Sequence, residues 1–231
     1  MTYLSSNQLK QYEDEGFVSP INIFSKEKAK QIRNEIELIE KDKPEEIEKS
    51  GRYNAHLISP LLDEVTHNSK ILDAVESLIG KNILVCGTTL FIKNPYEKGF
   101  VSYHQDAKYI GLEPYNWVTA WVAITDSNEK NGCMRMWSGS HRDDLKDHDQ
   151  MFNEGNLLTR GQTINDVPEK KVKSLILKAG QMSLHHPKVV HGSELNKSDD
   201  RRIGFVIQSY IGTNVKQVLG KNSVQLARGV D

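Results

Sequence analysis

The sequence has only two cysteines, Cys86 and Cys133, among its 231 residues. Both lie in apolar stretches with the character of strands, so we expect two buried free thiols, as in proteins of a reducing compartment, and no disulfide. The first residues show no basic segment followed by an apolar run, so no signal peptide is predicted. No apolar stretch approaches the roughly 20 residues of a membrane-spanning helix. Together these features predict a cytoplasmic protein that does not cross a membrane.

The chain also lacks an excess of charge of either sign. Its 30 basic and 31 acidic side chains give a formal net charge of −1, and the opposite charges are interspersed. This balance predicts no broad attraction to nucleic acid or to an anionic membrane surface. There is no internal repeat or low-complexity segment, and a hydrophobic content of 37% is ordinary for a globular protein. The predicted partner is a small molecule, and the sequence leaves the oligomeric state open.

Helices are predicted in the first 80 residues, where apolar side chains recur at helical spacing and glycine ends two of the runs. The predicted helices span residues 6–15, 25–42 and 69–79. From residue 82 onward, short β-branched and aromatic runs alternate with turn residues. The predicted strands span 83–93, 101–106, 117–125, 133–137, 172–177, 181–185, 189–191 and 203–211. We therefore predict a single domain of residues 1–231, with a helical part (1–80) packed on a β barrel or sandwich (81–231).

Two metal-capable side chains, His104 and Asp106, stand two residues apart in one predicted strand. If the backbone is extended there, both project from the same face. Such pairs also occur by chance, but His191 supplies a second imidazole downstream. Two imidazoles and a carboxylate form the facial triad that binds non-haem Fe(II) and leaves coordination positions open. The same alternation places four residues of a later strand on the inward face, near a barrel mouth: Arg202, Gly204, Val206 and Gln208.

These residues belong to a series of spaced motifs. The series comprises residues 104–109, Trp121, residues 131–134, 138–141 and 191–193, and Arg201-Arg202. From Glu15 to Gly229 the sequence resembles the phytanoyl-CoA dioxygenase family. The resemblance implies a mainly β fold with N-terminal helices, the double-stranded β-helix (a cupin-like jelly roll). It also implies an Fe(II)-dependent dioxygenase with 2-oxoglutarate and O2 as cosubstrates, in which His104, Asp106 and His191 are the iron ligands.

The resemblance also places the 2-oxoglutarate site. Arg202 matches the arginine that binds the distal carboxylate, and Ser193 matches a serine that hydrogen-bonds the same group. A guanidinium group can pair with a carboxylate through two hydrogen bonds. The alternative for an arginine here is a surface ion pair with Asp199 or Asp200. We assign that role to Arg201, because it points the opposite way in a strand.

Three further residues are predicted to contact 2-oxoglutarate. Trp121 and Thr89 fall where the family lines the cosubstrate pocket, although Trp121 is equally consistent with a core aromatic residue. Lys93 shares a strand face with Thr89 and is a candidate contact, with a solvated lysine at a strand end as the alternative.

The substrate side of the site is predicted from weaker signals. His56 is a candidate for a substrate-side wall, while Arg160 and Lys108 are candidates to meet an anionic substrate. Residues 139–171 are polar and without periodicity, and a loop of that length inside a domain is usually functional or mobile. We therefore predict a lid over the site. In members of the family the chain often continues briefly after the residues that match Arg228-Gly229. The resemblance therefore leaves open whether the native chain extends beyond Asp231.

The predicted activity is hydroxylation of a C–H bond of a small polar metabolite, with release of succinate and CO2. Related halogenases have a small residue where Asp106 stands, so a carboxylate at this position favours hydroxylation over halogenation. A non-catalytic, cupin-like barrel that binds a metal or ligand is the main alternative. A zinc hydrolase is a third possibility, since zinc accepts the same ligand set. Arg202 and Ser193 argue against both alternatives.

Overall fold

The N-terminal third is mainly helical in the computed structural model, which describes residues 3–47, 52–150, 152, 154–158 and 161–231. Its helices are α1 (Ser6–Glu15), α2 (Lys26–Asp42), α3 (Pro44–Ile47), η1 (Ala55–Leu57), α4 (Pro60–Thr66) and α5 (Ser69–Ile79). Helices α1, α2 and α5 begin where the side chains of Ser5, Ser25 and Asn68 accept hydrogen bonds from first-turn N–H groups. The three predicted helices are confirmed, and α4 is an additional one.

Strand β1 (Phe17–Asn22) is an element that the sequence analysis missed. It pairs with β11 (Gln181–His185) at the edge of the larger sheet. Its register shifts between Val18 and Ile21, around Pro20, and this broken alternation hides the strand in the sequence. An edge strand tolerates proline because no further strand needs its missing N–H. Since an N-terminal strand completes the core sheet, we propose that residues 1–231 form a single domain.

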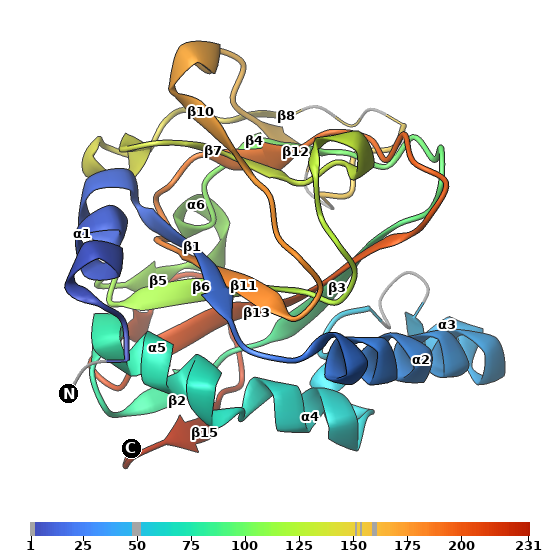
Figure 1. Cartoon of the computed structure of the whole chain (residues 1–231). Helices are drawn as coiled ribbons and strands as arrows, with labels where there is room; N and C mark the ends of the chain where they lie inside the picture. The colour runs from blue at the N-terminus through green and yellow to red at the C-terminus, as the bar shows by residue number, and fades with distance from the viewer. Residues whose placement is uncertain (1–2, 48–51, 151, 153, 159–160) are drawn as a thin grey trace.

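Two antiparallel sheets lie one above the other in the β core (Figure 1). The larger sheet has the order β1-β11-β6-β13-β2-β15, with β3 also paired to β13, and the smaller has the order β10-β7-β12-β4. Their remaining strands are β2 (Ile83–Val85), β3 (Thr88–Lys93), β4 (Val101–His104), β6 (Trp117–Ala123), β7 (Met134–Trp137), β10 (Val172–Leu175), β12 (His191–Ser193), β13 (Arg202–Gly212) and β15 (Gln225–Arg228). Helices α2, α4 and α5 cover the outer side of the larger sheet (Figure 1). This arrangement confirms the predicted double-stranded β-helix with N-terminal helices.

Strand β6 shows how alternation divides the interior. Val118, Ala120 and Val122 pack into the core beneath the helices, because successive side chains of a strand point to opposite faces. Trp121 packs between the two sheets, and Thr119 shares that inner face. The functional residues described below project from these inner faces.

The segment 139–171 was predicted as a loop, but its described residues include short elements. These are η3 (Ser140–Arg142), β8 (Asp149–Gln150), β9 (Gln162–Thr163) and η4 (Glu169–Lys171). Strand β9 runs beside β4, where the Ile164 N–H donates to the Tyr103 carbonyl at 2.7 Å and the Ser102 hydroxyl donates to the Gln162 carbonyl at 2.5 Å. These hydrogen bonds join residues about 60 positions apart in the chain, so the sequence of the segment by itself did not indicate the short strand.

The remaining described elements are small. They are α6 (Ala107–Ile110), η2 (Glu129–Asn131) and the paired strands β5 (Leu112–Glu113) and β14 (Lys216–Gln217). Both cysteines are free, with Cys133 buried and Cys86 half-buried. Within the described residues, every helix is too short or too polar to cross a bilayer.

Candidate metal and cosubstrate site

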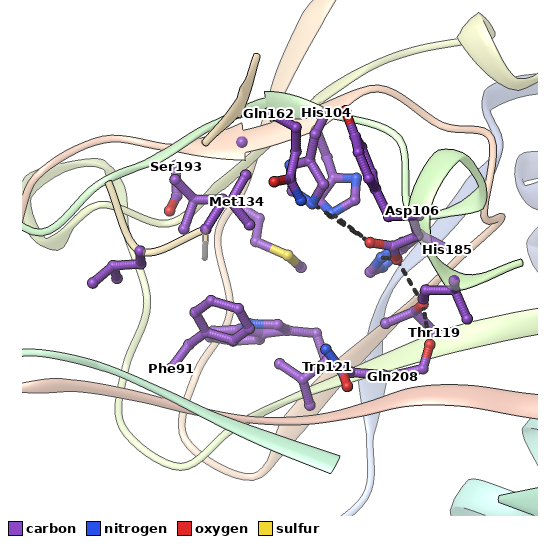
Figure 2. Close-up of a pocket in the computed structure, with 18 of the residues that line it drawn as sticks. Phe91, His104, Asp106, Thr119, Trp121, Met134, Gln162, His185, Ser193 and Gln208 are labelled. Atoms are coloured by element: carbon purple, nitrogen blue, oxygen red, sulfur yellow. Dashed lines mark hydrogen bonds and ion pairs between the residues drawn. The ribbon is translucent and has the colours of Figure 1, made fainter. Parts of the chain in front are cut away.

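Two histidines meet where β4 and β12 pair. His104 and His191 are direct partners in the antiparallel register, and their ring centres lie 4.2 Å apart. The Asp106 carboxylate approaches both, with Oδ1 at 3.4 Å from His104 Nε2 and 3.9 Å from His191 Nε2. One ligand atom from each of the three residues lies within 4.8 Å of the others. All three residues line one cavity, and Figure 2 shows His104 and Asp106 at one end of it.

The expected extended backbone through Asp106 is wrong, although the expected proximity is right. Strand β4 ends at His104, and Asp106 has the helical angles φ −56° and ψ −40° where α6 begins. The turn between them is held by the fully buried Gln105. Its side-chain amide donates to the Lys188 carbonyl at 2.7 Å and accepts from the Lys146 N–H at 2.8 Å. A turn therefore brings Asp106 to His104, where the sequence pattern suggested strand alternation.

Both histidines are in the tautomer that a divalent metal requires. Nδ1 of His104 lies 2.9 Å from the Ser102 carbonyl, and Nδ1 of His191 lies 3.1 Å from the Val189 carbonyl. A carbonyl only accepts, so Nδ1 carries the proton and the Nε2 lone pair faces the site.

The pKa shifts of His191 and Asp106 also favour binding of a divalent metal. Burial lowers the pKa of His191 to about 3, which keeps its imidazole neutral. Burial by itself raises the pKa of the Asp106 carboxyl, but His191, His104 and His185 together lower it well below its ordinary value. Two imidazoles that face the site through Nε2 and one carboxylate, with space beside them, suit Fe(II).

Arg202, at the start of β13, lies in the same cavity and is only 1% exposed. Its guanidinium carbon is 5.4 Å from the centre of the Trp121 ring, and its Nε has no hydrogen-bond partner among the described residues. Burial lowers the pKa of Arg202 to about 10, so the group remains charged at neutral pH. No carboxylate of the described chain pairs with it. A buried cation of this kind needs an anionic partner, which a ligand carboxylate can supply.

Arg201 points away from the cavity, as expected from its position next to Arg202. Its guanidinium makes a two-fold ion pair with Glu40 of α2 at 2.7 and 2.8 Å. The expected partners, Asp199 and Asp200, are wrong, because Asp200 pairs with Arg33 instead. Packing of α2 against the sheet brings these distant partners together.

Ser193 and Lys93 are joined to each other beside the cavity. The Lys93 ammonium donates to Ser193 Oγ at 2.7 Å and to the carbonyls of Ser193 and Glu194. Ser193 lines the cavity, whereas Lys93 is fully buried behind it. Burial, with the nearby Arg202, lowers the pKa of Lys93 to about 6. A solvated lysine at a strand end is therefore excluded, and Lys93 instead supports the cavity from behind, through its hydrogen bond to Ser193 and its backbone pairing with Arg202.

Of the other two residues predicted to contact 2-oxoglutarate, Trp121 lines the cavity and Thr89 does not. Trp121 lines the cavity beside Arg202. Its ring fills the space beside Gly204, where an added Cβ would lie 2.2 Å from Trp121 Cζ2, so this close packing requires glycine. Thr89 is buried on β3 opposite Val206, outside the cavity wall.

Two of the three predicted substrate residues, His56 and Lys108, lie outside the cavity wall. His56 is buried in η1 with Nδ1 at 2.8 Å from Thr88 Oγ1, and Lys108 is exposed on α6. Neither belongs to the cavity wall, and Arg160 lies outside the described residues. The wall is instead formed by residues that the sequence analysis did not single out as substrate contacts, including Tyr53, Phe91, Tyr109, Leu157, Gln162 and Gln208.

The adjacent histidines at the end of β11 take opposite faces. His185 lines the cavity, 3.5 Å from Asp106 Oδ2. His186 packs near Tyr12, Tyr115 and His141, outside the cavity wall. Strand alternation could have indicated this difference, but only once the β11 face that meets the cavity was known.

Known proteins share these sequence and structural features. The phytanoyl-CoA dioxygenase (PhyH) family matches residues 12–204. Peroxisomal phytanoyl-CoA dioxygenase from Bos taurus is 29% identical over 223 residues, covering 86% of this chain and 66% of the bovine protein. The chain thus spans just under two thirds of that relative. A probable alpha-ketoglutarate-dependent hypophosphite dioxygenase from Stutzerimonas stutzeri is 25% identical over 234 residues, covering 93% of this chain and 81% of the bacterial protein.

Solved structures show the same architecture. The apo form of ThoJ, a non-heme monooxygenase, aligns with a TM-score of 0.85 and 34% identity over 96% of this chain and 84% of that one. CytC3 with Fe(II) and alpha-ketoglutarate shares the fold, with a TM-score of 0.74 and 24% identity over 99% of this chain and 90% of that one. The family match and these alignments extend over most of the sequence. The chain therefore belongs to the phytanoyl-CoA dioxygenase family of Fe(II)- and 2-oxoglutarate-dependent oxygenases.

Proposed function

We propose that this protein hydroxylates a C–H bond of a small polar molecule with Fe(II), 2-oxoglutarate and O2. The observation that carries the proposal is the unpaired, buried Arg202 in the same cavity as the facial triad. A non-catalytic metal-binding barrel or a zinc hydrolase would have no need of a buried cation beside the metal-binding group. An oxygenase that binds a dicarboxylate does need one.

The roles of the side chains follow from their positions. His104, Asp106 and His191 would hold Fe(II), which supplies the activation of O2 that protein side chains lack. Arg202 binds the distal carboxylate of 2-oxoglutarate and Ser193 donates its hydroxyl to the same group. Trp121 forms a wall of the pocket and helps to exclude water. The overall reaction converts R–H, 2-oxoglutarate and O2 into R–OH, succinate and CO2.

The cavity supports a small polar substrate. Its volume is about 200 Å³, and Phe91, Tyr109 and Leu157 make much of its wall apolar. A second cavity of about 320 Å³ shares Tyr53, Tyr109 and Gln208 with it. The second cavity adds polar side chains: Asn54, Ser209, Lys221 and Asn222. We propose that the reacting carbon lies in the first cavity, beside the metal site, while polar groups of the substrate extend into the second. The substrate contacts predicted from the sequence at His56, Arg160 and Lys108 stay predictions.

A substrate screen tests this proposal. The purified protein is supplied with Fe(II), ascorbate, 2-oxoglutarate and a panel of small neutral and anionic compounds. We expect succinate release and O2 consumption to rise together with a subset of these polar compounds. Absence of 2-oxoglutarate turnover with every compound, from a protein shown to contain iron, would contradict the oxygenase function.

The product is expected to be hydroxylated and not halogenated. Asp106 occupies the position that a halide would need and also contributes a negative charge at the metal. Mass spectrometry of turnover in excess chloride should show one added oxygen, labelled at least partly from 18O2. A chlorinated product from the unmodified protein would overturn the inference from Asp106 to reaction type.

The segment 139–171 is proposed to close over the bound substrate. Among its described residues, Leu157, Leu158 and Gln162 line the cavity, and closure of such segments commonly shields a reaction from water. Amide hydrogen exchange in this segment should slow when iron, 2-oxoglutarate and substrate are all bound. The helix α2, which is remote from the cavity, serves as the internal control. Equal exchange of the segment in the free and bound states would argue against a lid.

The cytoplasmic location also remains a prediction, since mammalian relatives are named as peroxisomal.

A further inference from the structure

The two oxygens of the Asp106 carboxylate have different surroundings. Oδ1 faces His104 and His191, as described above. Oδ2 points the other way, at 2.9 Å from Thr119 Oγ1 and 3.5 Å from His185 Nε2 (Figure 2). His185 is not in the three-residue group that could hold a metal. One carboxylate oxygen is thus directed to the metal site, and the other to two side chains behind it.

Strand pairing brings these two side chains together. His185 of β11 and Thr119 of β6 are direct partners in the antiparallel register, so their side chains leave the same face side by side. Both strands lie inside the larger sheet, since β1 and β13 flank them. The sheet therefore presents a rigid pair of groups to Oδ2.

Thr119 by itself cannot always donate a hydrogen bond to Oδ2, because its hydroxyl has a second acceptor. Its hydroxyl has one proton and two acceptors within reach, Asp106 Oδ2 at 2.9 Å and the Gln208 carbonyl at 2.7 Å. When it donates to Gln208, a carboxylate oxygen is left without that partner. His185 is 1% exposed, and neither ring nitrogen has a hydrogen-bond partner among the described residues. An N–H at its Nε2 is the available donor, and a small movement of the carboxylate closes the 3.5 Å gap.

We propose that His185 is a positioning residue that, with Thr119, holds Oδ2 away from the metal so that Asp106 coordinates through Oδ1 alone. A carboxylate can bind a metal through one oxygen or two. Two-oxygen binding by Asp106 would occupy a position that 2-oxoglutarate or O2 requires. His185 also packs against the second ligand, His191, with ring centres 4.7 Å apart, and such outer contacts orient metal ligands.

The inference rests on the proposed metal site. Titration with Co(II) distinguishes failure of that site, which would appear in the wild type, from failure of the positioning role, which would appear only in the variants. We compare wild type with His185→Leu, which removes the donor, and His185→Gln, which keeps an N–H near the position of Nε2. His186→Gln is the matched control, since this neighbouring histidine is also partly buried but lies outside the cavity. His185→Leu should bind Co(II) about 10- to 100-fold more weakly, the range for lost outer contacts. His185→Gln should recover most of that loss, and His186→Gln should match wild type.

A second readout is the affinity of the metal-loaded protein for 2-oxoglutarate, measured without turnover from the absorption of the anaerobic Fe(II) complex. It should fall in His185→Leu more than in His185→Gln. Should His185→Leu fail to fold, Thr119→Val removes the other donor to Oδ2, and Thr119→Ser restores it. Metal and 2-oxoglutarate affinities equal to wild type in the folded donor-removing variant would overturn the inference.

Two further outcomes of the Co(II) titration would have different meanings. A loss in His185→Gln as large as in His185→Leu would make His185 a direct ligand and would also overturn the positioning role. A wild-type protein that binds no stoichiometric Co(II) would contradict the proposed function itself.

Discussion

Replacing His191 with alanine is expected to abolish stoichiometric Fe(II) binding. His191 is the in-register partner of His104 across β4 and β12, and it presents Nε2 to the carboxylate of Asp106. Without it the metal keeps only two protein ligands, His104 at the end of β4 and Asp106 at the start of α6. The loss of affinity should exceed the roughly 10- to 100-fold effect of removing an outer contact, because a ligand is removed directly. Anaerobic titration and metal analysis of the purified variant measure this effect.

Thermal unfolding provides an independent check of the same variant. A metal that binds only the folded state stabilises it by about 2.7 kcal/mol at a concentration 100 times the dissociation constant. Adding Fe(II) or Co(II) should therefore raise the Tm of the wild type and leave that of His191→Ala nearly unchanged. His141→Ala is the control, because this half-buried histidine lies outside the cavity. Unchanged metal affinity in His191→Ala would exclude it as a ligand.

Replacing Arg202 with alanine is expected to raise the apparent KM for 2-oxoglutarate strongly while iron binding persists. Arg202 is the buried cation of the cavity, and it has no competing carboxylate in the described chain. Truncating one member of a buried charge pair costs about 2–5 kcal/mol, which corresponds to roughly 30-fold or more in affinity. Arg202→Lys should recover only part of the loss, because an ammonium group cannot reproduce the two parallel hydrogen bonds of a guanidinium.

Arg201 offers a matched control in the adjacent position. Its ion pair with Glu40 is on the other side of the strand, partly exposed to solvent. Arg201→Ala should leave the KM for 2-oxoglutarate close to that of wild type and reduce stability by at most about 1 kcal/mol. If Arg201→Ala has the large effect on KM and Arg202→Ala does not, the assignment of the carboxylate-binding arginine is wrong.

Features that depend on local chain geometry could be predicted from the sequence. Helices α1, α2 and α5 have apolar side chains at helical spacing and capping residues at their ends, and these signals are contained in each segment. The opposite directions of Arg201 and Arg202 follow in the same way from the period of two in an extended chain. The identities of the triad residues were also readable, since two imidazoles and a carboxylate limit the chemistry.

Contacts between distant segments could not be predicted in the same way. The alternation of side chains along a strand predicted that His104 and Asp106 meet. They do meet, but the cause is a turn held by the buried Gln105. The hydrogen-bond partners of Gln105, Lys146 and Lys188, are about 40 and 80 residues away in the chain. Lys93 is predicted on the correct strand, yet its burial depends on pairing with Arg202 and on the carbonyls around Ser193.

The sequence by itself determined the fold class, the metal-binding residue types and the alternation within each strand, because these depend on neighbouring residues. Only the tertiary structure decided which faces enclose the cavity. It separated His185 from His186, placed His56 and Lys108 outside the wall, and joined β1 to β11. The physical reason is that cavity membership depends on the register between strands far apart in the chain, and that register is set by the packing of the two sheets and their helices.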